Sequence, residues 1–190
     1  MNGSGLPYLW MKVVAMAWLV IGRTAQAMAL FETMLRRWPS DAYALSSRSH
    51  LRNQQGQREA AIEDMQRLVA AQPEAGAAHW FNLAFLLEEA GRLDEAEAAF
   101  RRALALDPKL DRAWYGLGLV LIRLLRPEEA LAALKKNTEL QPMSPYGWYQ
   151  LARVQFDRQE PEEAKKIIRH LKGFEPKVAA QLERETGLVA

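Results

Sequence analysis

A period of 34 residues is the feature of this sequence that most constrains its fold. Trp80, Trp114 and Trp148 are separated by 34 residues each. Other residue types keep this period, or one of 35 residues: Ala96, Ala130 and Ala164; Pro108, Pro142 and Pro176; Gly22, Gly56 and Gly91; Pro39, Pro73 and Pro108. Because unrelated residue types repeat together, the sequence predicts an array of stacked structural units.

Each period has the pattern of two short helices joined by a turn. The first helix carries an aromatic residue, then a leucine and a small residue, as at Trp80, Leu83 and Ala84. The second helix brings another small residue and a large apolar one, as at Ala96 and Phe100. Small residues on both helices allow a close approach, and the large residues fill the space beside them. A proline then ends the second helix.

Residues 80–108 resemble a tetratricopeptide repeat, whose pattern is W-x2-L-G/A…G…A-x3-F-x2-A…P. The matching residues are Trp80, Leu83, Ala84, Gly91, Ala96, Phe100, Ala103 and Pro108. Residues 114–142 and 148–176 also match, although Leu125 replaces the turn glycine and Asn137 replaces an alanine in the first of these segments.

The resemblance implies an all-α fold, a right-handed α-solenoid of about five helix pairs within a single domain, 1–190. The expected repeats are 8–41, 42–76, 77–110, 111–144 and 145–178. Residues 179–188 are expected to form a polar terminal helix that caps the solenoid.

The second repeat is the most degraded. Gly56, Ala61, Met65 and Pro73 keep the pattern, but Arg48 stands where a buried leucine is expected. The first helix of this repeat should therefore be the least stable of the array, unless its polar groups serve a role in structure or binding.

The segment YLWMKVVAMAWLVIG, residues 8–22, is apolar on every face and carries one charge, Lys12. The repeat register makes it the first helix of repeat one, with four residues facing its own second helix and the next repeat: Trp10, Val14, Trp18 and Ile21. A signal or signal anchor is an alternative, because residues 25–27 form a small-x-small site. The run is shorter than the roughly 20 apolar residues of a transmembrane helix, so peripheral membrane contact is the third interpretation.

The same segment has apolar residues where this family faces its groove: Leu9, Val13, Met16, Leu19 and Val20. Exposed apolar patches of this size usually mark an interaction site. The sequence therefore predicts that the N-terminal helix docks onto a partner, a second copy of the chain in a homo-oligomer, or a membrane.

The resemblance also implies that the first helices line a concave groove that binds a protein or peptide segment. The groove residues predicted in this way are Phe81, Asn82, Phe85, Arg112, Tyr115, Leu119, Tyr146, Tyr149 and Arg153. Carrying the register further adds Ser46, Ser47, His50, Asn53, Arg123 and Gln150. Tyrosine and arginine are frequent binding hot spots, and arginine can hold a carboxylate through two hydrogen bonds.

Composition narrows the function classes. The net charge is only +2, so no nucleic-acid partner is expected. The chain has no cysteine, which excludes zinc–thiolate sites and a thiol nucleophile. The three histidines are scattered without metal-ligand spacing, and no phosphate loop or nucleophile motif appears. We therefore expect no catalytic residues, no metal and no cofactor.

The function predicted from the sequence is a non-catalytic protein-interaction adaptor or assembly scaffold, and not an enzyme. The alternative is a structural subunit of a larger complex, which could be membrane-bound, docked through the apolar N-terminal helix. A cytoplasmic location is expected, with membrane association and a periplasmic location left open.

Overall fold

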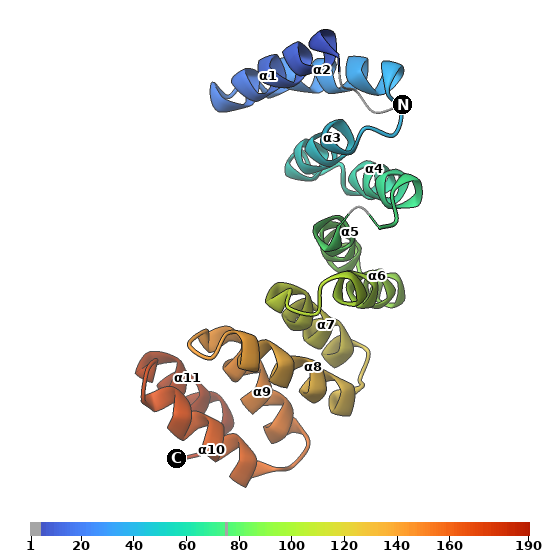
Figure 1. The fold of residues 1–190 in the computed structure, drawn as a ribbon. Helices are drawn as coiled ribbons and strands as arrows, with labels where there is room; N and C mark the ends of the chain where they lie inside the picture. The colour runs from blue at the N-terminus through green and yellow to red at the C-terminus, as the bar shows by residue number, and fades with distance from the viewer. Residues whose placement is uncertain (1–4, 75) are drawn as a thin grey trace. The chain divides into compact units, whose positions relative to one another are not determined.

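The computed structural model of the protein describes residues 5–74 and 76–190. Within these residues it contains eleven α-helices and no strands, as the sequence predicts (Figure 1). They are α1 (Leu6–Val20), α2 (Thr24–Arg37), α3 (Ala42–Gln54), α4 (Arg58–Ala71), α5 (Ala77–Glu89), α6 (Leu93–Leu106), α7 (Asp111–Arg123), α8 (Pro127–Leu140), α9 (Pro145–Asp157), α10 (Pro161–Lys172) and α11 (Pro176–Thr186). Residues 1–4, which belong to the segment considered as a leader, lie outside the described residues.

The helices form two compact units, divided between Gly91 and Arg92. In unit 1, which ends with α5, each helix packs against the next one along the chain. In unit 2 the helices α6 to α11 also pack in chain order, and α11 additionally contacts α9. The organisation of residues 1–190 as a single domain stays a prediction.

The turn between the two helices of each repeat has a left-handed residue at the same place. The φ angles are 76° at Gly22, 77° at Gly56, 77° at Gly91, 57° at Leu125 and 62° at Gln159. Glycine adopts this conformation freely, whereas an L-residue pays about 1–2 kcal/mol for it. The last two repeats therefore keep the turn geometry without the residue that suits it best.

Each periodic tryptophan makes the same hydrogen bond. The indole Nε1 of Trp80 donates to the carbonyl of Pro73 at 2.9 Å, and Trp114 donates to Pro108 at 2.8 Å. Trp148 donates to the carbonyl of Pro142, also at 2.8 Å. The repeated tryptophan and proline thus form one hydrogen bond that links the start of a repeat to the end of the previous one.

The second repeat contains a buried charged cluster in the place of an apolar contact. Arg48 binds Asp64 with both ends of its guanidinium, Nε to Oδ2 at 2.9 Å and Nη2 to Oδ1 at 2.5 Å. Arg52 adds a bond to Asp64 Oδ2 at 2.9 Å and another to the carbonyl of Ala60 at 3.1 Å. Arg48 is 8% exposed and Asp64 is 1% exposed. The unexpected arginine is therefore buried and paired, and it joins α3 to α4.

The fourth repeat reaches close packing through glycine. A Cβ at Gly118 of α7 would lie 2.8 Å from the side chain of Leu134 on α8. A Cβ at Gly116 would lie 2.4 Å from the ring of Phe100 on α6. Large side chains on the second helices therefore fill the space that the glycines leave.

Asn137, the departure from the family's alanine, is accommodated in the same way. It is buried, and its Nδ2 donates to the carbonyl of Asp111 at 3.0 Å. A Cβ at Gly147 of α9 would lie only 2.1 Å from its Oδ1. The larger residue on α8 thus requires the absence of a side chain on α9.

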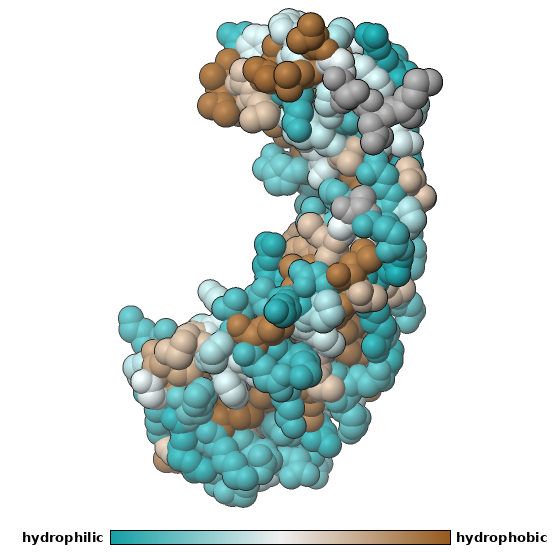
Figure 2. Space-filling model, in the orientation of Figure 1, coloured by the Kyte–Doolittle hydropathy of each residue, from teal (hydrophilic) through white to brown (hydrophobic). Residues whose placement is uncertain are grey.

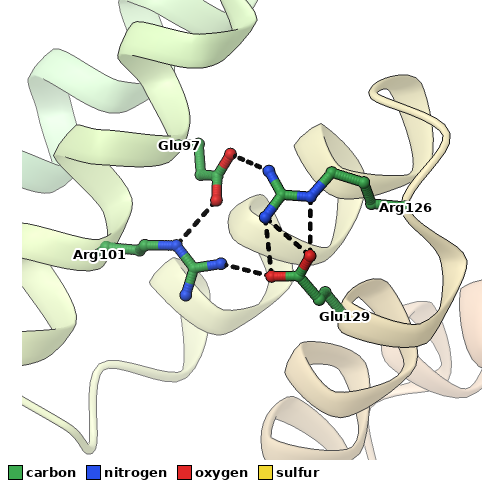
Figure 3. A network of polar contacts seen from close by, with 4 residues as sticks. All are labelled: Glu97, Arg101, Arg126 and Glu129. Atoms are coloured by element: carbon green, nitrogen blue, oxygen red, sulfur yellow. Dashed lines mark hydrogen bonds and ion pairs between the residues drawn. The ribbon is translucent and has the colours of Figure 1, made fainter.

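A ring of alternating charges joins α6 to the start of α8 (Figure 3). Arg126 contacts Glu97 at 2.5 Å and Glu129 at 2.7 Å, and Arg101 contacts the same two carboxylates at 2.8 and 2.9 Å. The hydrogen bond from Arg126 is the main reason that the pKa of Glu129 is lowered from its usual value. Because the ring is largely exposed, salt should weaken it.

Candidate functional site

The first helices of unit 1 form a pocket of about 340 Å³. Leu19 comes from α1, and Asn82, Phe85 and Leu86 come from α5. Between them α3 supplies Ser46, Ser47, Ser49, His50, Leu51 and Asn53, while Met65 of α4 completes the lining. Positions three and four apart lie on one helix face, which explains how a single stretch of α3 provides so much of the wall.

The lining combines apolar and neutral polar groups. Apart from the titratable imidazole of His50, no side chain among the described lining residues carries a charge. Asn53 Nδ2 reaches Glu89 Oε2 at 3.5 Å, and His50 Nε2 lies 3.0 Å from Gln54 Nε2. Phe85 leaves a large part of its ring exposed. The pocket can therefore offer hydrogen bonds and an aromatic surface to a neutral group.

The charged cluster of Arg48, Arg52 and Asp64 joins the two helices, α3 and α4, that supply this wall. Ser49, a lining residue, donates its hydroxyl to the carbonyl of Ala61 at 2.8 Å. Both features fix α3 on α4 through bonds that are shielded from water. The polar side chains of α3 are thus held on a rigid support, which favours binding without reorganisation.

The structure divides the residues predicted for the groove. In unit 1, Asn82 and Phe85 line the pocket, whereas Phe81 is half-buried and lies outside the lining. In unit 2, Tyr146 and Arg112 are exposed, and Leu119 is half-buried. Tyr115 is half-buried too, and its ring packs against the core cluster of Leu131, Leu134, Leu151 and Val154.

Tyr149 and Arg153 are brought together, but α11 already engages them. The Tyr149 hydroxyl donates to Glu185 Oε2 at 2.6 Å. Arg153 Nη1 lies 3.2 Å from the same carboxylate oxygen and 3.2 Å from the Tyr149 hydroxyl. The hydrogen bond from Tyr149, followed by that from Gln181, lowers the pKa of Glu185 from its usual value. This pair of groove residues therefore demonstrates carboxylate binding within the chain itself.

The N-terminal helix corrects part of the sequence interpretation. Ala15 is its one buried residue among those described, while Trp10 is 63% and Ile21 is 62% exposed. The prediction that Trp10 and Ile21 face the next helices is therefore wrong, although Val14 and Trp18 are partly buried. The reason is that a helix apolar on every face gives no periodicity from which its inner side could be read.

The predicted docking residues of α1 also fall into two groups. Leu9, Val13, Met16 and Val20 are exposed, and hydrophobic residues gather over α1 in the space-filling view (Figure 2). Leu19 is partly buried and lines the pocket instead. Sequence reasoning missed Ser49, Leu51, Met65 and Leu86 as lining residues. Ser49, Leu51 and Leu86 each lie three or four positions from a groove residue that the register identified, whereas Met65 belongs to the second helix of its repeat.

Two further findings bear on function. Within the described residues, no group of three or more His, Cys, Asp or Glu side chains is arranged to hold a metal ion. No helix in residues 5–74 or 76–190 is both long and apolar enough to span a membrane.

Comparisons with known proteins agree with this architecture. Two family models, both described as tetratricopeptide repeat, match residues 48–111 and 87–148. A comparison with curated protein sequences gives no significant match.

Several solved structures share the fold. The MamA protein aligns with a TM-score of 0.82 and 19% identity over 96% of each chain. A tetratricopeptide repeat protein from Parabacteroides merdae aligns with a TM-score of 0.83 and 19% identity, over 96% of this chain and 75% of that one. YrrB, described as a TPR protein with an unusual peptide-binding site, aligns with a TM-score of 0.79 and 17% identity, over 90% of this chain and 88% of that one. These likenesses confirm the all-α solenoid fold class.

Proposed function

We propose, from the premise that this chain belongs to the tetratricopeptide-repeat family, that it is a non-catalytic adaptor that binds a segment of another protein. The observation that carries the proposal is the pocket of unit 1, which three successive first helices line. Concave surfaces of helical repeats serve as extended binding faces. The description of YrrB as having a peptide-binding site adds support by analogy of fold.

The chemistry of the pocket indicates which part of a segment it would receive. Phe85, Leu86 and Leu19 offer an apolar surface for one large side chain. Ser46, Ser47 and Asn82 offer donors and acceptors for backbone amides or neutral polar groups. A charged side chain would lose hydration in this pocket without gaining an opposite charge. We therefore propose a segment that is uncharged where it enters the pocket.

The predicted groove residues of unit 2 are proposed as additional contacts. Arg112, Tyr115, Leu119 and Tyr146 would be among these contacts. Tyr149 and Arg153 would first have to exchange Glu185 of α11 for a carboxylate of the partner. An acidic residue in the bound segment would suit this second set of contacts.

Affinity capture from the source cells, followed by mass spectrometry, tests the proposal. The baits are wild type, Phe85→Ala and Asn82→Asp. Phe85→Ala removes the aromatic surface of the pocket, and Asn82→Asp adds a negative charge to it. Met143→Ala is the matched control, because Met143 is an exposed apolar residue outside the pocket.

We expect both pocket variants to bind the partner of wild type and of the control about fivefold or more weakly, as for a hot spot of about 1–3 kcal/mol. Far-UV circular dichroism should show unchanged helicity. A partner that all four proteins retain equally would contradict the pocket as the binding site. The double variant Arg112→Glu, Tyr115→Ala then tests unit 2 in the same way.

An alternative function is that of a structural subunit held in a larger complex through α1. The observation that favours it is the exposed apolar side of that helix. Under this alternative, Val13→Glu would release the protein from the complex and the pocket variants would not. If the pocket variants lose the partner and Val13→Glu keeps it, the pocket is the binding surface.

A further inference from the structure

The exposed side of α1 is a continuous apolar stripe with the spacing of a helix-pairing seam. Seven large side chains are between 50% and 86% exposed: Leu6, Leu9, Trp10, Val13, Met16, Val20 and Ile21. Five of them, Leu6, Leu9, Val13, Met16 and Val20, follow each other at intervals of three, four, three and four residues. These are the intervals at which two helices pack side chains into each other's gaps.

The rest of α1 is occupied by its own unit. Ala15 is buried, and the Tyr8 ring meets the Trp38 ring edge to face at 5.1 Å. Burial of the phenol, and then its hydrogen bond with Asp41, raise the pKa of Tyr8 to about 12. The α1 helix is therefore docked by one side on unit 1 and presents the other side to solvent.

The charge distribution points to the kind of occupant. Lys12 is the one charged residue of α1, and its Nζ lies 4.6 Å from the centre of the Tyr43 ring of α3. Just beyond the helix, Arg23 lies over the Trp18 ring at 5.6 Å. Helices that lie on membrane surfaces carry lysine and arginine along the border of their apolar side. A single lysine held over a tyrosine ring is not such a row of basic side chains, so another apolar helix suits the stripe better than a lipid surface.

We infer that the stripe pairs with the same stripe of a second copy of this chain, α1 against α1. An uncharged stripe is complementary to itself, as a two-fold interface requires. Val13 lies midway between Leu6 and Val20, so a two-fold axis at Val13 sets the Leu6 end of one helix beside the Val20 end of the other.

Two further considerations favour pairing. A stable interface buries roughly 800 Å² on each partner, and seven large, mostly exposed apolar side chains offer an area of that order. An isolated helix of 15 residues would be marginal in water, but α1 is already held in place by α2. Pairing would therefore order little that is not ordered in the monomer. The inference is independent of the pocket, because the two share no residue; Leu19 of α1 lines the pocket but does not belong to the stripe.

Sedimentation equilibrium of the full chain, over a wide range of concentration, tests the inference. We expect wild type to form a dimer, and we expect Val13→Glu to raise its dissociation constant by at least about tenfold, because a carboxylate would be buried in an apolar seam. Met143→Glu, which adds the same charge at an exposed apolar residue of unit 2, should leave the dimer unchanged.

A cysteine cross-link gives a second measurement that does not depend on a charged variant. The chain has no cysteine, so Val13→Cys would introduce its one thiol. At a two-fold axis this thiol meets its own copy, and mild oxidation should produce a covalent dimer. Met143→Cys should stay largely monomeric under the same conditions.

Three outcomes would overturn the inference. They are a wild type that stays monomeric, a dimer that Val13→Glu leaves intact, and a Val13→Cys protein that cross-links no faster than Met143→Cys. A monomer that floats with phosphatidylcholine vesicles, and loses this property in Val13→Glu, would assign the stripe to a membrane instead. A monomeric wild type that keeps its pocket ligand would leave the proposed adaptor function standing.

Discussion

The helix pair α3–α4 and the helix pair α7–α8 have the same architecture and opposite chemistry. Arg48 and Asp64 join the first pair through buried charges, whereas Leu117 and Ala133 stand at the equivalent places of the second. In the second pair, Gly118 leaves room for Leu134. The comparison teaches that the same arrangement of two helices can be held together either by paired buried charges or by apolar side chains packed against glycine.

Removing one charge from α3–α4 should have the largest effect. In Asp64→Ala the guanidinium of Arg48 would be buried without its partner, so we expect a loss of about 3–5 kcal/mol in the free energy of unfolding. Urea unfolding followed by far-UV circular dichroism measures it. The double variant Arg48→Leu, Asp64→Ala copies α7–α8 and should recover most of the loss. If the double variant is as unstable as the single one, apolar residues cannot replace the charged pair in α3–α4.

A steric substitution in unit 2 should have the next largest effect. Gly147→Ala would place a Cβ against Asn137 Oδ1, and we expect a cost of about 1–3 kcal/mol in the free energy of unfolding. The preceding repeat has Ala103 and Ala113 at the two equivalent places. Adding Asn137→Ala to Gly147→Ala recreates that pair and should restore stability, as measured by urea unfolding. Additive losses in the double variant would show that the two residues are not coupled.

The left-handed turns sharpen the comparison between the units. Leu125 is left-handed and 86% exposed, so its side chain gains little from packing. Leu125→Gly should raise the free energy of unfolding by about 0.5–1 kcal/mol, since relief of the backbone strain exceeds the added freedom of the unfolded chain. Gly56→Ala in unit 1 should lower it by a similar amount. A Leu125→Gly protein that melts below wild type would mean that the leucine contributes more than its exposure indicates.

The contact of α9 with α11 should give the smallest effect and a distinctive pH dependence. The pKa of Glu185 is lowered in the folded protein, mainly by the Tyr149 hydroxyl. Its contribution to stability is therefore present above the usual carboxyl pKa of 4.5 and is lost as the pH falls below that value. Glu185→Gln should lower the melting temperature slightly at pH 7, and by less at pH 3, where the contribution of the carboxylate is being lost. An equal change in melting temperature at pH 7 and pH 3 would show that packing, rather than charge, causes the effect.

The sequence predicted the features that recur and missed those that occur once. The period revealed the helix pairs and the turn positions, including Leu125, because these features recur in every repeat. It could not reveal that Arg48 pairs with Asp64, since the two lie 16 residues apart and no other repeat has either. Of the residues that line the pocket, the register named six in advance: Ser46, Ser47, His50, Asn53, Asn82 and Phe85.

The side of α1 that faces outward, and the contact of Glu185 with Tyr149 and Arg153, depended on tertiary packing. For the first, the register named Leu9, Val13, Met16 and Val20, which are exposed, but it assigned Trp10 and Ile21 to the inner side, because an all-apolar helix has no polar side to mark the boundary. The contact of Glu185 could not be predicted, because the sequence of the terminal helix indicates only a solvated cap and does not show which way its carboxylates point.

The bond from each indole to the proline before it also has an optical consequence. Trp80, Trp114 and Trp148 each lie at a different junction between repeats, with the indole N–H held by a carbonyl. Indole emission shifts to longer wavelength when water reaches the ring, so each junction carries its own fluorescent reporter. Helical arrays can open piece by piece. Versions of the protein that keep one of these three tryptophans, with phenylalanine at the chain's other tryptophans, would therefore report the order in which the junctions separate.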